Sequence, residues 1–387
     1  MSPRRRSFGS ITKLPSGRLR ASYQDPHSGE RVAADRTFLT RTDASAWLSS
    51  VQADISRGEL LDARLGRRAF AEWADDWLDG LHVRPTTKIG YESVLRNHVL
   101  PAFESRQVAS IRYADCKRFV DSLLAKGLAP GTASEARKVL RMVLGEALKS
   151  EAIRRNPADG IRVPRGMRQE MMFLSHDEVL RLADAISRPT PTKYRPAVEF
   201  PQYGLLVCLT ALTGLRAGEV GALRIGRVNV LHSRVEIAES VSERTGQLFF
   251  GPTKTYERRT VPIPPAIADE LVHHLETRPS DPDAFVFASP DDGPLRHNNF
   301  YKRHYKKAVA EAGLDPRTRF HDLRHTAAAL MIAEGAHLLA VKERLGHSSI
   351  QVTADRYGHL FPSLEEALTA RLDASFRAAV ERRRSAG

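Results

Sequence analysis

The fold of this chain is decided by the stretch TRFHDLRHTAAALMIAEG, residues 318–335. On a helix, His321 and Arg324 stand three positions apart and therefore lie on one face. His325 follows His321 by four positions, a spacing that also suits two zinc ligands. Because no carboxylate or thiol pattern completes such a site, we expect no metal here. We interpret His325 as a structural residue.

The next stretch, VKERLGHSSIQVTADRYGHLF, residues 341–361, adds two more chemical groups. Gly346 is placed to end a helix, because helices often close on a glycine in the left-handed conformation. His347 follows this helix end directly, and Tyr357 stands ten residues beyond it. The two stretches together predict a helical region that carries imidazole, guanidinium and phenol groups.

Upstream, residues 204–228 read GLLVCLTALTGLRAGEVGALRIGRV and predict an apolar helix, a break at Thr213-Gly214 and a second helix. Arg216 stands at the start of that second helix, with Glu219 one turn further on. An arginine at a helix start presents its guanidinium and the helix dipole to a phosphate. Taken alone, this feature is a weak indication of phosphate binding.

Between these helices the sequence predicts strands, at RVEIAES, residues 234–240, and at QLFFGPTKTYERRTVPIP, residues 247–264. Pro252 to Thr255 are expected to form a turn between two strands, with Lys254 on the tip of a hairpin. A lysine at such a position is usually a solvated surface residue. Its interpretation therefore depends on the motifs around it.

Four motifs follow one another in the chain: TGLRAGE, TKTYERRTVPI, HDLRHTAAAL and LGHSSIQVTADRYGH. In this order they resemble the catalytic motifs of the tyrosine recombinases, the phage integrase family. The resemblance extends from Phe173 to Leu360, and the His-x-x-Arg and LGH…Tyr motifs are its most specific parts. The helical region before Phe173 is similar to the family's core-binding domain, and the basic N-terminal segment resembles its arm-type binding domain.

The resemblance implies a role for each matching residue. Two arginines hold the scissile phosphate, a lysine and a histidine handle protons, a second histidine steadies the transition state, and the tyrosine attacks. An acidic residue supports the arginines. The two arginines are Arg216 and Arg324, the lysine is Lys254 and the histidine that handles protons is His321. The second histidine is His347, the attacking tyrosine is Tyr357 and the acidic residue is Glu219.

The chemistry of phosphodiester attack explains these residue types. Negative charge builds on the non-bridging oxygens in the transition state, and two guanidinium groups each donate paired hydrogen bonds to them. We therefore expect no metal and no other cofactor. A tyrosine with its ordinary pKa of about 10 needs a nearby base or positive potential to become a nucleophile. The phosphotyrosine bond conserves energy, so the strand can be resealed without ATP.

The sequence predicts a multidomain α+β protein. Residues 1–66 are expected to form a small arm-binding β-sheet of three strands followed by a helix, and residues 67–165 an all-α core-binding domain. Residues 166–361 are expected to form a mainly α catalytic domain with a small antiparallel sheet. Residues 362–387 form a tail helix whose apolar stripe packs on its own domain or, as the resemblance implies, on a neighbouring subunit.

Charge indicates the partner. The chain has 59 Lys and Arg against 46 Asp and Glu, a net charge of +13, which attracts polyanions, although high charge also simply keeps proteins soluble. The first 41 residues hold nine basic and three acidic side chains, which favours a DNA-binding sheet over a solvated arm. A predicted helix at residues 132–151 offers Arg137, Lys138 and Arg141 on faces other than its apolar stripe, as either phosphate contacts or solvated charges. The DNA-binding candidates are Arg4, Arg5, Arg6, Lys13, Arg18, Arg20, Arg137, Lys138 and Arg141.

Cysteine content and hydropathy bear on the location. Cys116 and Cys208 are far apart and lack a CxxC partner, so neither a disulfide framework nor a cysteine-based zinc site is predicted. No apolar run approaches the roughly 20 residues that cross a bilayer. The basic first residues are not followed by an apolar segment, so a secretion signal is not expected. We expect a cytoplasmic protein that works on DNA in a bacterial host.

The resemblance also implies the partners and leaves alternatives. An integrase of this family joins double-stranded attachment-site DNA as a homotetramer, with core and arm-type sites, a host DNA-bending protein and an excisionase. One alternative is a chromosome- or plasmid-resolving tyrosine recombinase, which the basic N-terminal unit disfavours. Another is a non-catalytic DNA-binding regulator of the same fold, which the complete set of polar residues disfavours.

Overall fold

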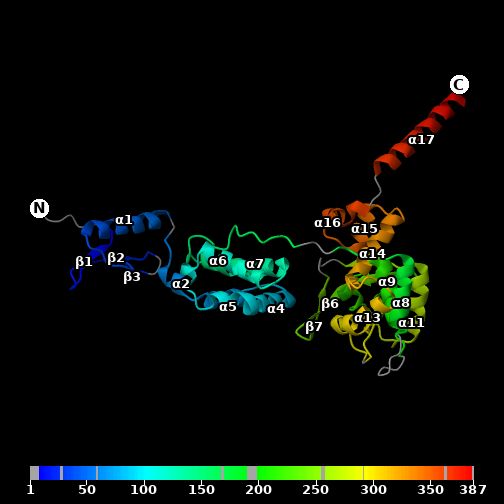
Figure 1. Cartoon of the computed structure of the whole chain (residues 1–387), viewed down its shortest axis with the longest axis horizontal. Coiled ribbons are helices and arrows are strands. Elements are labelled where there is room, and N and C mark those ends of the chain that lie inside the picture. Colours follow the sequence, from blue (N-terminus) through cyan, green and yellow to red (C-terminus); the bar gives the residue numbers. More distant parts are fainter. Residues whose placement is uncertain are drawn as a thin grey trace. The chain divides into compact units, whose positions relative to one another are not determined.

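The computed structural model describes residues 8–26, 29–57, 60–166, 170–189, 198–253, 258–290, 292–360 and 364–385. The chain divides into two compact units, residues 1–168 and residues 169–387 (Figure 1). The first unit holds a small sheet and a helical bundle, and the second holds most of the predicted chemical groups.

The chain begins with the predicted small sheet. Strands β1 (Ser10–Lys13), β2 (Leu19–Gln24) and β3 (Arg31–Ala33) are antiparallel in the order β1-β2-β3, and α1 (Arg41–Arg57) follows. Alternation along β2 turns Ala21 and Tyr23 toward α1, where Leu48 meets them in a buried cluster. The expectation of a three-stranded sheet followed by one helix is confirmed.

A helical bundle completes the first unit. Its main helix is α7 (Pro130–Lys149), in which a stripe of seven fully buried apolar residues from Ala133 to Ala147 recurs at helical spacing. Phe70, Trp73 and Phe119 pack in the same core. The remaining elements are α2 (Ala63–Arg67), α3 (Phe70–Asp79), α4 (Pro85–Val94), η1 (Leu95–Val99), α5 (Leu100–Phe103), η2 (Val108–Ser110) and α6 (Tyr113–Ala125).

The second unit begins with the helices that carry its core. A capping box forms at the start of α8 (His176–Ser187), where Ser175 Oγ accepts from the Glu178 N–H at 3.2 Å. Helix α9 (Pro201–Thr213) is apolar on nearly all sides and packs against α8 and α14 (Phe320–Ala333). An all-round apolar helix belongs in the middle of a domain. Helices α9 and α14 therefore form its centre.

The strands of the second unit form two small antiparallel sheets. One has the order β4-β5-β8, from β4 (Val228–Asn229), β5 (Arg234–Ile237) and β8 (Arg259–Pro262). The other is a hairpin of β6 (Glu239–Arg244) and β7 (Gln247–Pro252). The predicted small antiparallel sheet is thus present, as two separate pieces.

The remaining helices surround this core. They are α10 (Ala217–Val220), η3 (Ile225–Arg227), α11 (Pro265–Glu276), α12 (His297–Phe300), η4 (Tyr301–Tyr305), α13 (Lys306–Glu311), α15 (Leu338–Leu345), α16 (Ile350–Tyr357), η5 (Gly358–Leu360) and α17 (Leu364–Ser385). In α17, Leu372 and Phe376 are 59% and 70% exposed, so this helix carries an apolar stripe that its own chain leaves uncovered. Across the described ranges, none of the helices combines the length and the apolar character needed to cross a membrane.

Gly214 fixes how the central helices meet. It ends α9 with φ of +72°, and a Cβ built on it would lie 2.3 Å from Leu345 Cδ2. Both the left-handed backbone and the close approach of α15 therefore require glycine.

We expect Gly214→Ala to lower the free energy of unfolding by about 1–3 kcal/mol, from backbone strain together with the clash. Gly246→Ala is the matched control, because Gly246 has φ of +79° but nothing within 4 Å of its Cβ position. Urea denaturation of both variants measures the difference. Equal losses in the two variants would show that the contact with Leu345 contributes nothing.

Candidate active site

Arg324 lies at the centre of the site. Its side chain is 1% exposed on the buried face of α14, and its two terminal nitrogens donate to the carbonyl oxygens of Gly214 and Leu345, each at 2.6 Å. Burial and the nearby Arg216 lower the pKa of this guanidinium to about 9. Arg324 therefore remains charged at neutral pH, with its position fixed by two backbone carbonyls.

Arg216 and Glu219 come together at the start of α10. Arg216 Nη1 donates to Glu219 Oε1 at 2.7 Å, and Arg216 Nη2 donates to the carbonyl of Gly346 at 2.9 Å. Glu219 is 1% exposed. Burial alone would raise the pKa of its carboxyl group, but hydrogen bonds and charge from Arg259 and Arg216 outweigh burial and lower it to about 2.

Arg259, which was not among the predicted site residues, completes this cluster from strand β8. Its two terminal nitrogens donate to the two oxygens of Glu219 at 2.9 and 2.6 Å, and its Nε donates to the carbonyl of Arg344 at 3.4 Å. The available signal was the alternation of β8, which turns Arg259 to the same side as the buried Val261. Arg259 is a charged residue at a position where this alternation calls for a buried one.

The end of α15 joins these arginines. The carbonyls of three consecutive residues, Arg344, Leu345 and Gly346, accept from Arg259, Arg324 and Arg216 respectively. The last carbonyls of a helix have no partner within the helix and lie at the negative end of its dipole. The end of α15 thus fixes three guanidinium groups on three consecutive carbonyls.

The three histidines of the site are uncharged at neutral pH. His321 faces solvent, yet surrounding protein atoms and the charge of Arg324 lower the pKa of its imidazole to about 4. His347 is 7% exposed, and burial with Arg324 lowers its pKa to about 3. Its Nδ1 lies 2.8 Å from Thr353 Oγ1, and its Nε2 is buried with no partner within the described part of the chain.

Tyr357 ends α16 and is completely buried. Its hydroxyl lies 2.7 Å from Nδ1 of His325, and its ring stacks on that of His347 with centroids 6.3 Å apart. Burial raises the pKa of the phenol, although Arg324 and Arg356 act in the opposite direction. His325, interpreted from sequence as merely structural, is therefore the direct partner of Tyr357. The helical spacing of His321 and His325 places both imidazoles on one face of α14, but it does not indicate that His325 contacts Tyr357.

Lys254 lies outside the described residues, but its flanking strands are described. The expectation of a hairpin tip is wrong, because β7 pairs with β6 while β8 pairs with β5, so the segment with Lys254 joins two different sheets. Side chains tether the β6–β7 hairpin: Arg224 Nε donates to Glu239 Oε1 at 2.5 Å, and Arg296 donates to the carbonyl of Gly246 at 2.8 Å.

Comparisons with known proteins agree with this arrangement. Residues 172–363 match the model of the phage integrase family, residues 7–57 its phage integrase N-terminal domain, and residues 69–124 its N-terminal SAM-like domain.

The chain belongs to the phage integrase family.

Relatives of similar length support the assignment. The chain is 28% identical over 379 residues to a protein of Mycobacterium tuberculosis named as a prophage phiRv2 integrase, covering 95% of this chain and 96% of that protein. It is 26% identical over 387 residues to the integrase of Mycobacterium phage D29, covering 96% and 98%.

Solved structures of integrases share the fold. The integrase of the Tn1549 transposon, in complex with a circular intermediate DNA, matches with a TM-score of 0.67 at 19% identity, over 78% of this chain and 99% of that chain. A lambda integrase dimer bound to a core site matches with a TM-score of 0.57 at 17% identity, over 92% and 96%. The chain therefore has the tyrosine recombinase fold, with a small N-terminal sheet, helical domains and small antiparallel sheets.

The family's N-terminal domain contains the small sheet and part of the predicted DNA contacts. Arg4, Arg5 and Arg6 lie outside the described residues. In β2, Arg20 lies opposite Thr12 of β1 on the polar face that turns away from α1, whereas Lys13 pairs with Leu19 and so belongs to the other face. Arg18 is exposed, and its guanidinium donates to the side chain and the carbonyl of Thr37 at 2.6 and 3.0 Å.

The predicted basic residues of α7 differ in their surroundings. Lys138 is exposed, donates to Glu135 at 3.1 Å and lies over the ring of Tyr91. Arg137 is half-buried, and its Nε has no partner among the described residues. Arg141 Nε donates to Asp159 at 2.5 Å, so the carboxylate neutralises its charge. Lys138 and Arg141 thus each pair with a carboxylate, whereas Arg137 has no such ion pair among the described residues and is the better candidate for a phosphate contact.

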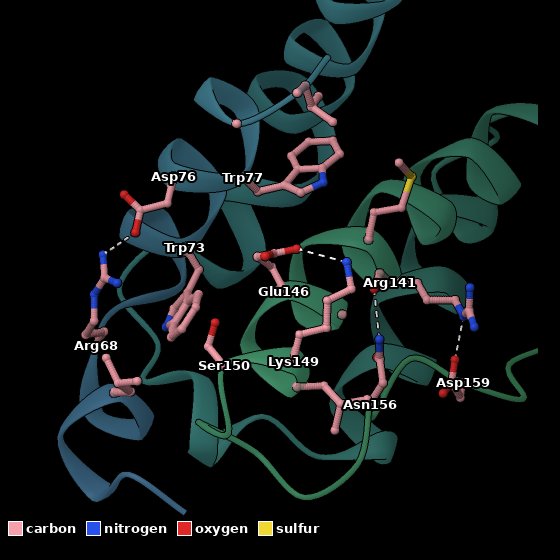
Figure 2. Close-up of a pocket in the computed structure, with 16 residues that line it drawn as sticks. Arg68, Trp73, Asp76, Trp77, Arg141, Glu146, Lys149, Ser150, Asn156 and Asp159 are labelled. Carbon is pink, nitrogen blue, oxygen red and sulfur yellow. Dashed lines mark hydrogen bonds and ion pairs between the residues drawn. The ribbon is translucent and has the colours of Figure 1, made fainter. Parts of the chain in front are cut away.

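A cavity of about 810 Å³ lies in the helical bundle between α3 and the end of α7. Figure 2 shows Trp73 and Trp77 on its wall together with three ion pairs. Arg68, Lys149 and Arg141 pair with Asp76, Glu146 and Asp159, so the charges on the wall cancel. A wall without net charge is a poor surface for a phosphate backbone, and this cavity is separate from the arginine cluster.

Glu219 provides a test of the arginine cluster. We expect Glu219→Gln to lower the free energy of unfolding at pH 7 by about 3–5 kcal/mol, because two guanidinium groups lose a buried carboxylate. The folded-state pKa of about 2 lies below the unfolded value of 4.5. The stabilisation is therefore complete above pH 4.5, and it disappears as the pH falls through about 2.

The control is Glu236→Gln, because Glu236 also pairs with two arginines, Arg227 and Arg258, but is one-third exposed. An exposed pair of this kind contributes about 1 kcal/mol or less. Urea denaturation at several pH values measures both variants. A difference between wild type and Glu219→Gln that does not shrink on acidification contradicts the assignment of that stabilisation to the carboxylate charge.

Proposed function

We propose that this chain is a site-specific DNA recombinase, an integrase that cuts and rejoins attachment-site DNA through a covalent bond between Tyr357 and a DNA 3′-phosphate. The observation that carries the proposal is the arginine cluster at the end of α15, with Tyr357 and three neutral histidines around it. Family membership supports the same reaction. The DNA in question belongs to a phage, a prophage or a similar mobile element.

Arg216 and Arg324 bind the scissile phosphate. Two of the three guanidinium groups share the Glu219 carboxylate and the third has only carbonyl partners, so the cluster keeps an excess of positive charge that a phosphate can neutralise. As the phenol oxygen approaches phosphorus, charge accumulates on the non-bridging oxygens, where the two guanidinium groups stabilise it. His347, whose Nε2 has no partner in the described chain, is placed to add one further hydrogen bond.

The bonds and protons balance within the protein and the DNA. The Tyr357 oxygen forms a bond to phosphorus while the bond from phosphorus to the 5′-oxygen breaks. The neutral imidazole of His321 accepts the phenol proton, and Lys254 gives a proton to the leaving 5′-oxygen. Attack by a 5′-hydroxyl of the partner strand reverses these steps, so the strands exchange without ATP.

The remaining parts of the chain provide DNA recognition and assembly. We assign core-site binding to the helical domain at residues 67–165 and arm-site binding to the N-terminal sheet within residues 1–66. The catalytic domain spans residues 166–361. The exposed apolar stripe of α17, in residues 362–387, docks on a neighbouring subunit in a homotetramer. A lambda integrase tetramer bound to a Holliday junction has the same fold, with a TM-score of 0.55.

Integration in a cytoplasmic setting also requires partners that bend DNA and set direction. We assign these roles to a host DNA-bending protein and an excisionase, as in the resemblance. The match of the chain's first part to an integrase N-terminal domain favours this reading over a resolving recombinase.

The nucleophile is tested by trapping the covalent adduct on a nicked attachment-site duplex. Wild type should form a protein–DNA adduct that resists EDTA, and Tyr357→Phe should form none, because the phenol oxygen is gone. The matched control is Tyr305→Phe, which removes another fully buried hydroxyl, one that donates to the carbonyl of Arg319 at 3.1 Å. Denaturing electrophoresis measures the adduct. An adduct formed by Tyr357→Phe would disprove the assignment of the nucleophile.

Arm-site binding is tested with Arg20→Ala. If Arg20 contacts one phosphate, its loss should weaken binding to arm-type DNA and reduce the slope of log affinity against log salt by about 0.9. Arg57→Ala is the control, since Arg57 lies at the end of α1, which covers the other face of the sheet. Fluorescence anisotropy over a salt series measures the slopes. Identical slopes in both variants would exclude the sheet face as the phosphate contact.

A further inference from the structure

The attachment of α16 to the rest of the chain is unusually sparse. Only two of its eight residues, Thr353 and Tyr357, are buried, and each makes one hydrogen bond to a histidine. Thr353 Oγ1 lies 2.8 Å from Nδ1 of His347, and the Tyr357 hydroxyl lies 2.7 Å from Nδ1 of His325. At the other end of the helix, Ile350 is 48% exposed. The buried polar contacts that hold α16 are therefore these two hydrogen bonds, and only the second of them holds the Tyr357 hydroxyl.

The environment of Tyr357 is that of a core residue. Its ring packs in a cluster with Ala328, Ile332, Val341 and Leu345. Its only hydrogen bond in the described chain is to His325, which is 5% exposed and whose ring lies against that of His321 with centroids 4.9 Å apart. In this position no atom of Tyr357 reaches solvent.

A phosphate cannot approach the hydroxyl in this arrangement. The DNA backbone comes from solvent, and among the arginines of the cluster Arg216 is the one with the most exposed side chain, at 25%. A bond between the phenol oxygen and phosphorus requires the two atoms to come within about 3–3.5 Å before reaction. Tyr357 must therefore leave its buried position, and the contact with His325 must be given up.

We propose that His325 is a positioning residue for the nucleophile: its hydrogen bond holds the Tyr357 hydroxyl in a buried resting position, and the phenol reaches DNA only after this bond breaks. The inference rests on the proposed function, because it assigns a role to the partner of the proposed nucleophile. His325 contacts the phenol oxygen only in the resting position, and in this role it contacts neither the DNA nor the scissile phosphate. It lowers the fraction of protein molecules in which the Tyr357 hydroxyl is released and can reach DNA.

The resting position is tested first without DNA. Tetranitromethane nitrates accessible tyrosines, and trypsin releases the segment from Tyr357 to Arg371, which contains no other tyrosine. We expect Tyr357 to react roughly five-fold faster in His325→Leu than in wild type, the factor that corresponds to one neutral hydrogen bond. His325→Asn, whose amide places an acceptor near the position of Nδ1, should react at nearly the wild-type rate.

His274→Leu is the matched control for a lost histidine. His274 is half-buried in the same unit, and its Nε2 lies 2.7 Å from the carbonyl of Val286. Its replacement should leave nitration of Tyr357 unchanged. An unchanged rate in His325→Leu, or equal rates in the leucine and asparagine variants, would overturn the proposal.

A second measurement does not depend on the folding of His325→Leu. In protein labelled with ¹⁵N-histidine, Tyr357→Phe should shift the side-chain nitrogen resonance of His325, whereas Tyr305→Phe should not. The resonance of His325 is identified by its loss in His325→Asn. If Tyr357→Phe leaves it in place, the hydrogen bond does not exist in solution and the proposal fails.

A DNA-cleavage assay distinguishes a failure of this inference from a failure of the proposed function. On a nicked duplex that carries a single core half-site, one bound protomer has no neighbour to reposition its α16. There we expect His325→Leu to form adduct roughly five-fold faster than wild type and His325→Asn to match wild type. Slower or equal cleavage by His325→Leu would overturn the resting role. If wild type forms no adduct on any site, the proposed function fails, while the nitration result still decides whether His325 holds Tyr357.

Discussion

The structure of the second unit depends on one helix end. At the C-terminus of α15, the carbonyls of Arg344, Leu345 and Gly346 accept from three arginines that come from β8, α14 and α10. An ordinary helix leaves these carbonyls to water. Here they gather three distant parts of the chain around one point, and Gly346, in the left-handed conformation, makes room for the side chain of Arg259. Each guanidinium is thus fixed before any phosphate is present.

Like charges placed so close together need compensation, and Glu219 supplies it. Its buried carboxylate binds two of the three guanidinium groups, while Arg324 receives only carbonyl dipoles. Burial, together with the same excess of positive charge, lowers the pKa of His321 and His347 because both disfavour the protonated imidazole. A neutral imidazole can accept a proton, which a charged one cannot. The electrostatics of the cluster and the acid–base chemistry assigned to it therefore have a common origin.

Much of this arrangement could be predicted from sequence, because the informative patterns are local. The buried stripe of α7 follows from spacings of three and four, the N-terminal sheet from alternation and turn residues, and the break at Gly214 from its glycine. The motifs around Arg216, Arg324 and Tyr357 identified the family. Local patterns could not predict which side chains and strands from distant segments contact one another.

Three site features show this limit. Arg259 meets Glu219 across 40 positions and His325 meets Tyr357 across 32, and neither pair has a local signature. The partner strand of β8 is β5 and not its neighbour β7, so the turn predicted around Lys254 had the wrong partners. In each case the sequence shows which residue or strand is present, but the packing of the whole unit decides which partner it contacts.

The separation of the two small sheets has a mechanical consequence. No backbone ladder joins the β6–β7 hairpin to the β4-β5-β8 sheet among the described strands, and side chains of Arg224 and Arg296 hold it instead. Besides these two arginines, the hairpin is held by the buried Val241 of β6 and by the stack of Phe250 on Phe285, so every contact that fixes it is made by side chains. Lys254, the proton donor that we propose, follows β7 in sequence, so the strand that leads to it shares no backbone ladder with Arg259 of β8.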